Sequence, residues 1–394
     1  MPSATENFFA PCPRGLEGVL AAELEQLGAQ FVAAADGGVG FTGPFQLCYR
    51  VNLESRIASR VLWRIAASRY RSEEDIYKTV LALPWSGWFD VGRTIMVKVS
   101  AKKCPLRSLD FVTLKIKDAV CDKFRAEVRA RPSVDTAGPD IRIHAFLDAT
   151  NFTLYLDTSG EALFKRGLRK TSTEAPLREN LAAGILRLAG WEPGVPLLDP
   201  MCGSGTFLLE AAQMALKIAP GLGRHFAFEK LKNFDAASWG KLRREAEAQR
   251  LPLSPQPIWG SDLYGDVLKA ARENLAAAGL AEAVQLKQAN VLEISAPAAE
   301  GVLVTNPPYG VRLGEQAELA EFYPKLGDAL KRKFAGWRAY IFTADPQLPK
   351  LIRISASRRT PLFNGALECR LLEYKMVAGG MRKKPSGASE EKTA

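Results

Sequence analysis

The sequence predicts an α/β protein in which a doubly wound, Rossmann-like C-terminal domain follows an α+β N-terminal region. From residue 196 onward, short apolar strands alternate with amphipathic helices, the order that builds a mostly parallel sheet. Before residue 160 short strands and helices also alternate, but segments 141–147 and 151–156 have the pattern of a hairpin pair. A length of 394 residues suits two or three domains.

The N-terminal region has two segments of helical periodicity with a strand between them. Residues 15–27 carry Leu and Val at helical spacing, and Gly28 follows where a left-handed residue commonly ends a helix. Residues 94–100 alternate like a strand, and residues 115–129 again place apolar side chains on one face. Three lysines of this second helix lie off that face and are candidates for contacts with the phosphates of a polyanionic partner: Lys115, Lys117 and Lys123.

The C-terminal region predicts strands that end in polar residues. A helix that starts near Leu177 leads into a strand ending at Asp199, and the next two strands end at Asp262 and Asn290. A fourth strand is followed by Asn306. Because the carboxyl ends of parallel strands meet at one edge of a sheet, we expect these side chains to line one site. A helix is expected at 266–278, and later strands at 339–343 and around 369–374.

The first of these strands runs into a Gly-x-Gly turn and then a helix. Such glycines let the backbone approach a ligand, and the first helical turn offers free N–H groups. Leu208 stands where a dinucleotide fingerprint needs its third glycine, and Asp199 would repel a pyrophosphate. A ligand with an amino group and a positive sulfonium fits better, which indicates S-adenosylmethionine. The residues expected to bind it here are Asp199, Cys202, Gly203, Ser204, Gly205 and Thr206.

The strand 301–305 is followed by Asn306-Pro307-Pro308-Tyr309. The Asn side-chain carbonyl and the first Pro carbonyl can each accept one N–H of an exocyclic amine, and neither proline offers a competing donor. The Tyr ring can stack on a base that has left its helix. We interpret these four residues as catalytic; for the tetrapeptide alone, a rigid turn is the alternative.

Two further strand ends are assigned to the cofactor. Asp262 is expected to accept both ribose hydroxyls, the alternative being an N-cap for the following helix. Asn290 is expected to accept the N–H of the adenine amine, and Asn306 borders the cofactor as well as the substrate. Cys202 could be a nucleophile for pyrimidine methylation, but its place in a glycine turn favours a packing role.

These blocks resemble the THUMP-containing RNA guanine-N2 methyltransferases, and among them the bacterial enzymes that methylate a guanine of large-subunit ribosomal RNA. The stretch from Asp199 to Glu210 is similar to their signature, and Asn306 to Gly310 to their catalytic motif. The family usually has Asp where this chain has Asn290. Some members carry a fused second methyltransferase; this chain stops before such a half, so one activity is expected. Further similar blocks lie at 12–17, 164–169, 175–183 and 219–222.

The resemblance implies S-adenosylmethionine as cofactor and structured ribosomal RNA as partner. It also implies that Arg166 and Arg169 guide the RNA backbone into the site. The alternative is that both belong to a structural connector between the domains and do not contact RNA. The expected limits are 1–60 for a ferredoxin-like domain, 61–160 for a THUMP RNA-binding domain that in the family can start near 45, 161–376 for a class I methyltransferase domain and 377–394 for a disordered basic tail.

Composition favours a polyanionic partner in a reducing compartment. The 53 Lys and Arg exceed the 43 Asp and Glu, which gives a net charge of +10. Residues 93–131 hold eleven basic against four acidic side chains, and residues 331–370 hold nine against two. The six cysteines are widely spaced and there are two histidines, so we expect no metal site. No leader or 18-residue apolar run is present, and we expect a cytoplasmic monomer without membrane contact.

Three other functions compete with the leading one. The Asn-Pro-Pro-Tyr motif serves any aromatic amine, so methylation of adenine N6 or of a guanine in transfer RNA is an alternative reaction. A non-catalytic RNA-binding or ribosome-assembly factor is the alternative from another class. Intact runs at Asp199–Glu210 and Asn306–Tyr309 argue against a decayed enzyme.

Overall fold

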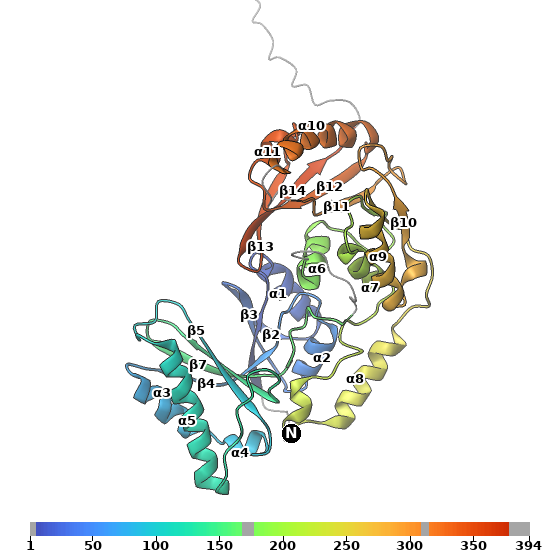
Figure 1. The fold of residues 1–394 in the computed structure, drawn as a ribbon. Helices are drawn as coiled ribbons and strands as arrows, with labels where there is room; N and C mark the ends of the chain where they lie inside the picture. Colours follow the sequence, from blue (N-terminus) through green and yellow to red (C-terminus); the bar gives the residue numbers. More distant parts are fainter. Residues whose placement is uncertain (1–4, 168–176, 309–314, 378–394) are drawn as a thin grey trace, which may run out of the picture.

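The computed structural model describes residues 5–167, 177–308 and 315–377, and two seven-stranded sheets organise this part of the chain. Figure 1 shows an elongated molecule in which the elements of the second sheet lie at one end and α3 and α5 lie at the other. No helix in these ranges is both long and apolar enough to cross a membrane.

The N-terminal sheet has the order β2-β3-β1-β4-β7-β6-β5. Its strand β4 pairs with β1 on one side and with β7 on the other, so a single sheet crosses the domain limit expected at residue 60. The elements of this half are β1 (Glu6–Pro11), α1 (Glu17–Gln26), β2 (Gln30–Ala35), β3 (Gly38–Gly43), α2 (Leu47–Glu54), β4 (Leu62–Arg69), α3 (Glu73–Leu81), α4 (Trp85–Trp88), β5 (Ile95–Ala101), α5 (Leu109–Val128), β6 (Ile141–Leu147) and β7 (Asn151–Asp157).

Local sequence explains where the helices of this half begin and end. Ser72 and Asp75 form a capping box at the start of α3, and the Ser108 hydroxyl accepts the N–H of Phe111 at the start of α5. Gly28 follows α1 with a φ of 94°, as the sequence predicted. The hairpin of β6 and β7 is confirmed as an antiparallel pair. Helix α5 begins six residues before the segment that periodicity had indicated, because the Ser108 cap precedes an exposed first turn.

The C-terminal sheet has the order β10-β9-β8-β11-β12-β14-β13, with parallel strands from β10 to β12. The chain moves outward from β8 in one direction through β9 and β10, and then in the other through β11 and β12. This doubly wound order confirms the predicted fold class. The elements are α6 (Glu179–Leu188), β8 (Leu197–Asp199), α7 (Thr206–Ala215), η1 (Ala227–Lys230), α8 (Ala236–Ala248), β9 (Ile258–Asp262), α9 (Gly265–Ala277), η2 (Ala281–Ala283), β10 (Gln285–Gln288), β11 (Gly301–Thr305), α10 (Glu315–Lys333), β12 (Trp337–Thr343), α11 (Leu348–Leu351), β13 (Arg358–Asn364) and β14 (Leu367–Lys375).

Two hydrophobic clusters cover the faces of this sheet. The first contains buried residues of α6, α7 and α9, and it continues without a break into the N-terminal half as far as Phe8. The second contains buried residues of α10 and α11, including Tyr323 and Leu348. The shared cluster means that the two halves pack as one body. At one point of contact, a Cβ on Gly184 would lie 2.3 Å from a Leu16 methyl, so any larger residue would force the Leu16 side chain to move.

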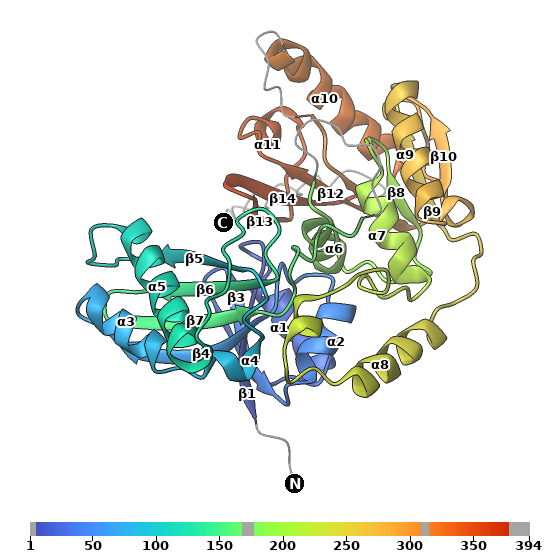
Figure 2. The same cartoon turned by 60° about the horizontal axis from the view of Figure 1, so that its bottom comes forward.

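A buried ion cluster also joins the halves. The guanidinium of Arg166 lies 3.2 Å and that of Arg56 lies 3.6 Å from the same carboxylate oxygen of Glu210 on α7. Arg166 also donates to the backbone carbonyl of Arg56 at 2.9 Å. All three side chains are buried, so the cluster fixes the position of α7 against the loop that follows α2. Figure 2 shows α6 and α7 beside α1 and α2 from a second direction.

Candidate active site

The predicted cofactor residues meet where the sheet reverses its winding direction. Asp199 ends β8, and Asn306 follows the neighbouring strand β11. Asp262 ends β9 on the other side of β8, and Asn290 follows β10. In doubly wound folds the crevice outside the carboxyl ends at this reversal is the usual place of ligand binding. The strand register therefore brings together the four residues that sequence alone had placed on separate strands.

Asp199 is a buried carboxyl group at the centre of this edge. Its side chain accepts the N–H of Met201 at 3.3 Å. Burial raises the pKa of the Asp199 carboxyl to about 8, opposed by the side chain of Thr305 and the Met201 N–H and assisted by the nearby charge of Asp262. A cation bound here would restore the ionised form, so the group suits a ligand with an ammonium or sulfonium.

The glycine turn after β8 has the open geometry that its residues predicted. Gly203 and Gly205 have φ values of 56° and 84°, which favour glycine. A Cβ added to Gly203 would meet no protein atom within 4 Å, so the turn leaves space beside its backbone. The turn is anchored to α9, because the buried amide of Asn274 donates to the Ser204 carbonyl at 3.1 Å.

Asp262 holds the same turn from the side of β9. One carboxylate oxygen accepts the N–H of Gly203 at 3.0 Å, and the other accepts the N–H of Tyr264 at 3.3 Å. Tyr264, and not Asp262, is the N-cap of α9. A carboxylate has about four lone-pair sites, so two acceptor positions remain for hydroxyl donors.

Asn290 and Cys202 have local roles in the structure. The side-chain oxygen of Asn290 accepts the N–H of Leu292 at 3.0 Å, which fixes the amide at the end of β10. Burial raises the pKa of the Cys202 thiol well above its usual range, with the charges of Asp199 and Asp262 acting in the same direction. A thiol that resists ionisation is a poor nucleophile, so the packing interpretation of Cys202 is the better one.

The turn after β11 is supported from α10. Asn306 is half-buried, Pro307 is buried and the carbonyl of Pro308 accepts the hydroxyl of Tyr323 at 3.3 Å. The same hydroxyl lies 3.2 Å from a carboxylate oxygen of Asp345, in the loop after β12. Tyr323 is fully buried, so this contact holds Pro308 in place beyond the end of β11.

Sequence reasoning missed Asn274 and Tyr323. Both lie on helical faces that are otherwise apolar, next to Ala271 and Leu275 in the one case and to Leu319 and Leu326 in the other. A buried polar side chain on such a face needs a hydrogen-bond partner. A polar residue within an apolar helical stripe is therefore the sequence feature that could have identified both.

The five predicted RNA-binding residues have different environments in the structure. Arg166 has a side chain that is 1% exposed and is paired with Glu210, so the expectation that it contacts RNA is corrected: burial makes it a structural connector. Arg169 and Tyr309 lie outside the described residues, as does the predicted tail from residue 378. The three α5 lysines are each paired with a carboxylate: Lys115 with Glu74, Lys117 with Asp118 and Lys123 with Glu127.

Together these features define a class of enzyme. The doubly wound fold, the glycine turn with space beside Gly203, and two buried carboxyl groups at the strand ends fit S-adenosylmethionine, whose sulfonium and amine carry positive charge. Asp199 and Gly203 would face the methionine end and Asp262 the ribose. The fold and site are those of a methyltransferase that uses S-adenosylmethionine.

Comparison with known proteins gives the family. The RMKL-like methyltransferase domain matches residues 166–373, the THUMP domain residues 70–157 and the RlmL ferredoxin-like domain residues 7–62. The chain belongs to the RMKL-like methyltransferase family and is an RNA methyltransferase.

Three similar proteins illustrate the relationship. A Synechocystis sp. protein that carries the name of an RNA methyltransferase is 40% identical over 375 residues, which cover 95% of this chain and 98% of that protein. The Ribosomal RNA large subunit methyltransferase K/L of Shewanella sp. strain ANA-3 is 40% identical over 96% of this chain, but this chain spans 54% of that protein. A methyltransferase solved in complex with SAH is 32% identical, with a TM-score of 0.86 over 96% of this chain and 99% of that one.

Proposed function

We propose that this methyltransferase transfers a methyl group from S-adenosylmethionine to the exocyclic N2 amine of a guanine in large-subunit (23S) ribosomal RNA. The observation that carries the proposal is Asn306 with its two prolines, held by Tyr323 at the end of β11 beside Asp199. The large-subunit substrate is supported by the name of the Shewanella relative and by the THUMP domain between residues 70 and 157.

The residues of the chain would act by positioning. The Asn306 side-chain oxygen and the Pro307 carbonyl accept the two N–H groups of the amine, which aims the nitrogen lone pair into the crevice. When bound, S-adenosylmethionine supplies a sulfonium methyl that is already activated for attack. As the nitrogen–carbon bond forms and the carbon–sulfur bond breaks, the two carbonyl oxygens offset the positive charge on nitrogen. The extra proton then leaves to water, and Tyr309 is expected to stack on the base.

The Asn306→Ala variant tests this arrangement. Loss of one preorganised contact to developing charge typically lowers the rate about a hundredfold to a thousandfold. Single-turnover transfer of labelled methyl to 23S ribosomal RNA from cells that lack the gene should show this loss in Asn306→Ala. The matched variant Asn290→Ala should instead weaken cofactor binding and leave the saturated rate close to that of the wild type. An Asn306→Ala rate near that of the wild type would disprove the role of the amide.

Nucleoside analysis of the product separates the competing reactions. N2-methylguanosine in 23S RNA is the expected product. N6-methyladenine would establish the adenine alternative, and methylation of transfer RNA alone would move the substrate to the other RNA class. Binding of RNA without any methyl transfer would instead support the non-catalytic alternative, a ribosome-assembly factor.

A further inference from the structure

The face of the N-terminal sheet that lies opposite α3 and α5 carries a row of basic and aromatic side chains. Side chains of a strand alternate between the two faces, and Ile143, Ala145 and Leu154 are buried in the cluster that includes α5. Their neighbours in sequence therefore lie on the other face. Register places Lys98 beside His144, His144 beside Tyr155, and Tyr155 beside Arg64, across β5, β6, β7 and β4.

A second row runs next to the first. Phe146 on β6 pairs with Ser100 on β5 and with Thr153 on β7. Phe146 is 39% exposed although it carries a large apolar side chain. The Tyr155 ring lies 6.3 Å from the ring of Phe9 on β1, so the aromatic surface extends to the centre of the sheet. We name this set (Lys98, Phe146, His144, Tyr155 and Arg64) the open sheet face.

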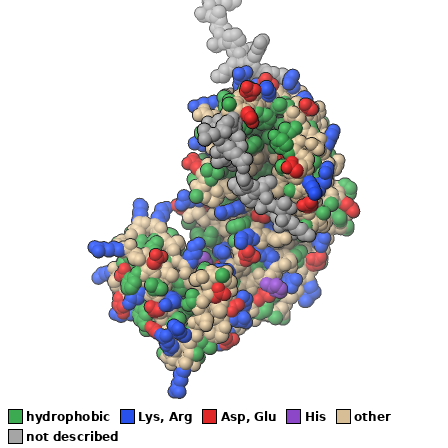
Figure 3. Space-filling view, in the orientation of Figure 1, with side chains coloured by type: hydrophobic (Ala, Val, Ile, Leu, Met, Phe, Trp, Pro, Cys, Tyr) green, Lys and Arg blue, Asp and Glu red, His purple; other side chains and the backbone are tan. Residues whose placement is uncertain are grey.

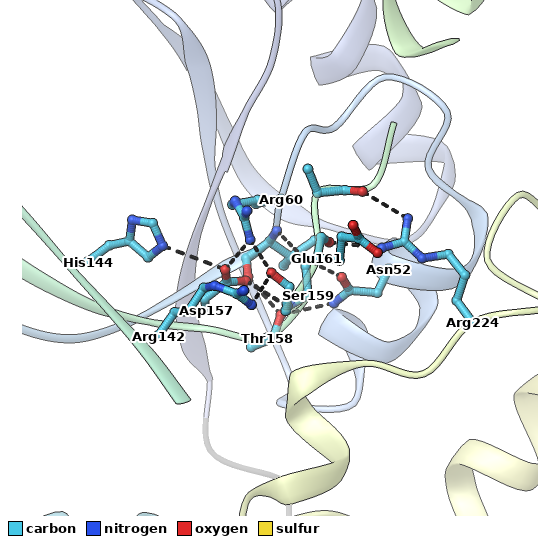
Figure 4. Close-up of polar contacts among 12 residues, drawn as sticks. Asn52, Arg60, Arg142, His144, Asp157, Thr158, Ser159, Glu161 and Arg224 are labelled. Carbon is cyan, nitrogen blue, oxygen red and sulfur yellow. Dashed lines mark hydrogen bonds and ion pairs between the residues drawn. The ribbon is translucent and has the colours of Figure 1, made fainter. Parts of the chain in front are cut away.

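The charge of the open sheet face is positive. Lys98 and Arg64 are exposed, and neither forms an ion pair with the described residues. The one carboxylate on this side of β7, Asp157, has no exposed side-chain surface and is paired with Arg60. Figure 4 shows this pairing, with His144 pointing toward the same carboxylate at 3.6 Å. The four strands carry no other acidic side chain on this face, and the nearby carboxylate of Asp36 is paired with Lys102 just after β5 at 2.8 Å.

The helices on the opposite face offer a weaker basic surface. Each α5 lysine is already paired with a carboxylate, and the side chains of Lys115, Lys117 and Lys123 are 31%, 29% and 25% exposed. Figure 3 shows Lys and Arg side chains over the lobe that contains α3 and α5, interspersed with Asp and Glu. A phosphate on α5 would have to compete with these acidic partners.

We propose that the open sheet face binds a single-stranded segment of the RNA substrate. Bases would stack on Phe146 and Tyr155, while Lys98 and Arg64 contact phosphates on either side. Three inter-strand spacings separate these two cations, about 14 Å, so a short stretch of chain can bridge them. A rigid duplex cannot lay its stacked bases on such a surface. This inference rests on the proposed RNA substrate and adds which surface and which form of RNA are used.

The test compares matched variants of the two faces in the full-length chain. Fluorescence anisotropy with a labelled single-stranded RNA 20-mer measures affinity over a range of salt concentrations. Lys98→Ser with Arg64→Ser should reduce the salt slope by about 1.4, because each single-strand phosphate contact contributes about 0.7. Phe146→Ala should weaken binding at least fivefold and leave the slope unchanged, since a base loses its stacking partner. Phe146→Leu should behave similarly, because it keeps the apolar volume and removes the ring.

The control is Lys115→Ser with Lys117→Ser, which removes the same charge from α5. Equal or larger losses in this control, with wild-type binding by the sheet-face variants, would overturn the proposal and locate the RNA on α5. A labelled duplex that binds more tightly than the single strand and ignores Phe146→Ala would overturn it as well. Methyl transfer to 23S RNA is measured separately on the wild type, so failure of the proposed reaction leaves the binding result interpretable.

Discussion

Asp199 is buried where we propose that the cationic cofactor binds, so its protonation should be linked to cofactor binding. Its pKa of about 8 in the free protein means that the carboxyl is mostly protonated at pH 7. Attraction to the positive cofactor favours the ionised form. We expect binding at pH 7 to release a proton, and the affinity to rise with pH until about 8 and then level off. Calorimetry in buffers of different ionisation enthalpy measures the released proton.

The same shift makes a prediction about folding. The folded-state pKa of Asp199 lies above its unfolded value, so the folded protein without cofactor binds one more proton between about pH 4 and pH 8. The free energy of unfolding should therefore fall as pH rises through this window, by up to about 1.4 kcal/mol per unit from this group. Asp199→Asn should remove that slope and also weaken the cofactor. An unchanged slope in Asp199→Asn would contradict the assignment of the shift to this residue.

At the scale of elements, Tyr323 on α10 contacts the turn after β11, which we propose to be catalytic. Tyr323→Phe deletes the hydroxyl that contacts the Pro308 carbonyl and Asp345, and it keeps the ring. We expect a lower single-turnover rate with an unchanged cofactor dissociation constant. Tyr340→Phe on β12 is the matched control, because it removes a half-buried hydroxyl 3.3 Å from Glu373 outside the crevice. Equal rates in the two variants would show that the Tyr323 contact is only structural.

The sequence predicted those elements that have a strong local signal. The strands ending at Asp199 and Asp262 are apolar runs that stop at a polar residue, and both ends are as expected. Strand β13 was missed, because Arg358–Asn364 contains Pro361 and several polar residues and has no apolar alternation. It forms a strand at the edge of the sheet because it pairs with β14, a tertiary contact that the local sequence does not encode. The continuous N-terminal sheet was also missed, since the contact between β1 and β4 rests on two residue pairs far apart in sequence.

In the candidate site, too, residues with a local sequence signal could be predicted and residues that depend on tertiary contacts could not. Glycine turns and strand ends are local, so the turn at Gly203 and Gly205 and the grouping of the four strand-end residues at one edge of the sheet could be predicted before the fold was known. Arg166 could not, because its basic neighbours suggest a surface, while its actual partner Glu210 lies 44 positions later on α7. The supporting contact of Tyr323 depends on the packing of α10, which no local pattern specifies.

At the scale of the whole molecule, the cluster of Arg56, Arg166 and Glu210 joins the N-terminal half to α7, the helix that follows the glycine turn. Glu210→Gln keeps the shape of the side chain and leaves two buried guanidinium groups without their shared carboxylate. Removing one partner of a buried ion pair typically costs about 3–5 kcal/mol, so the free energy of unfolding in urea should fall by an amount of that order.

The exposed pair of Lys165 and Glu161 provides the control for this prediction. Both side chains are 61% exposed, and solvent screens their attraction. Glu161→Gln should therefore change stability little, although it lies only five residues from Arg166 in the sequence. Because Glu210 belongs to the helix that begins at the glycine turn, Glu210→Gln should also weaken cofactor binding, and added S-adenosylmethionine should recover part of the lost stability. Equal stability of the two variants would mean that the buried cluster does not hold the halves together.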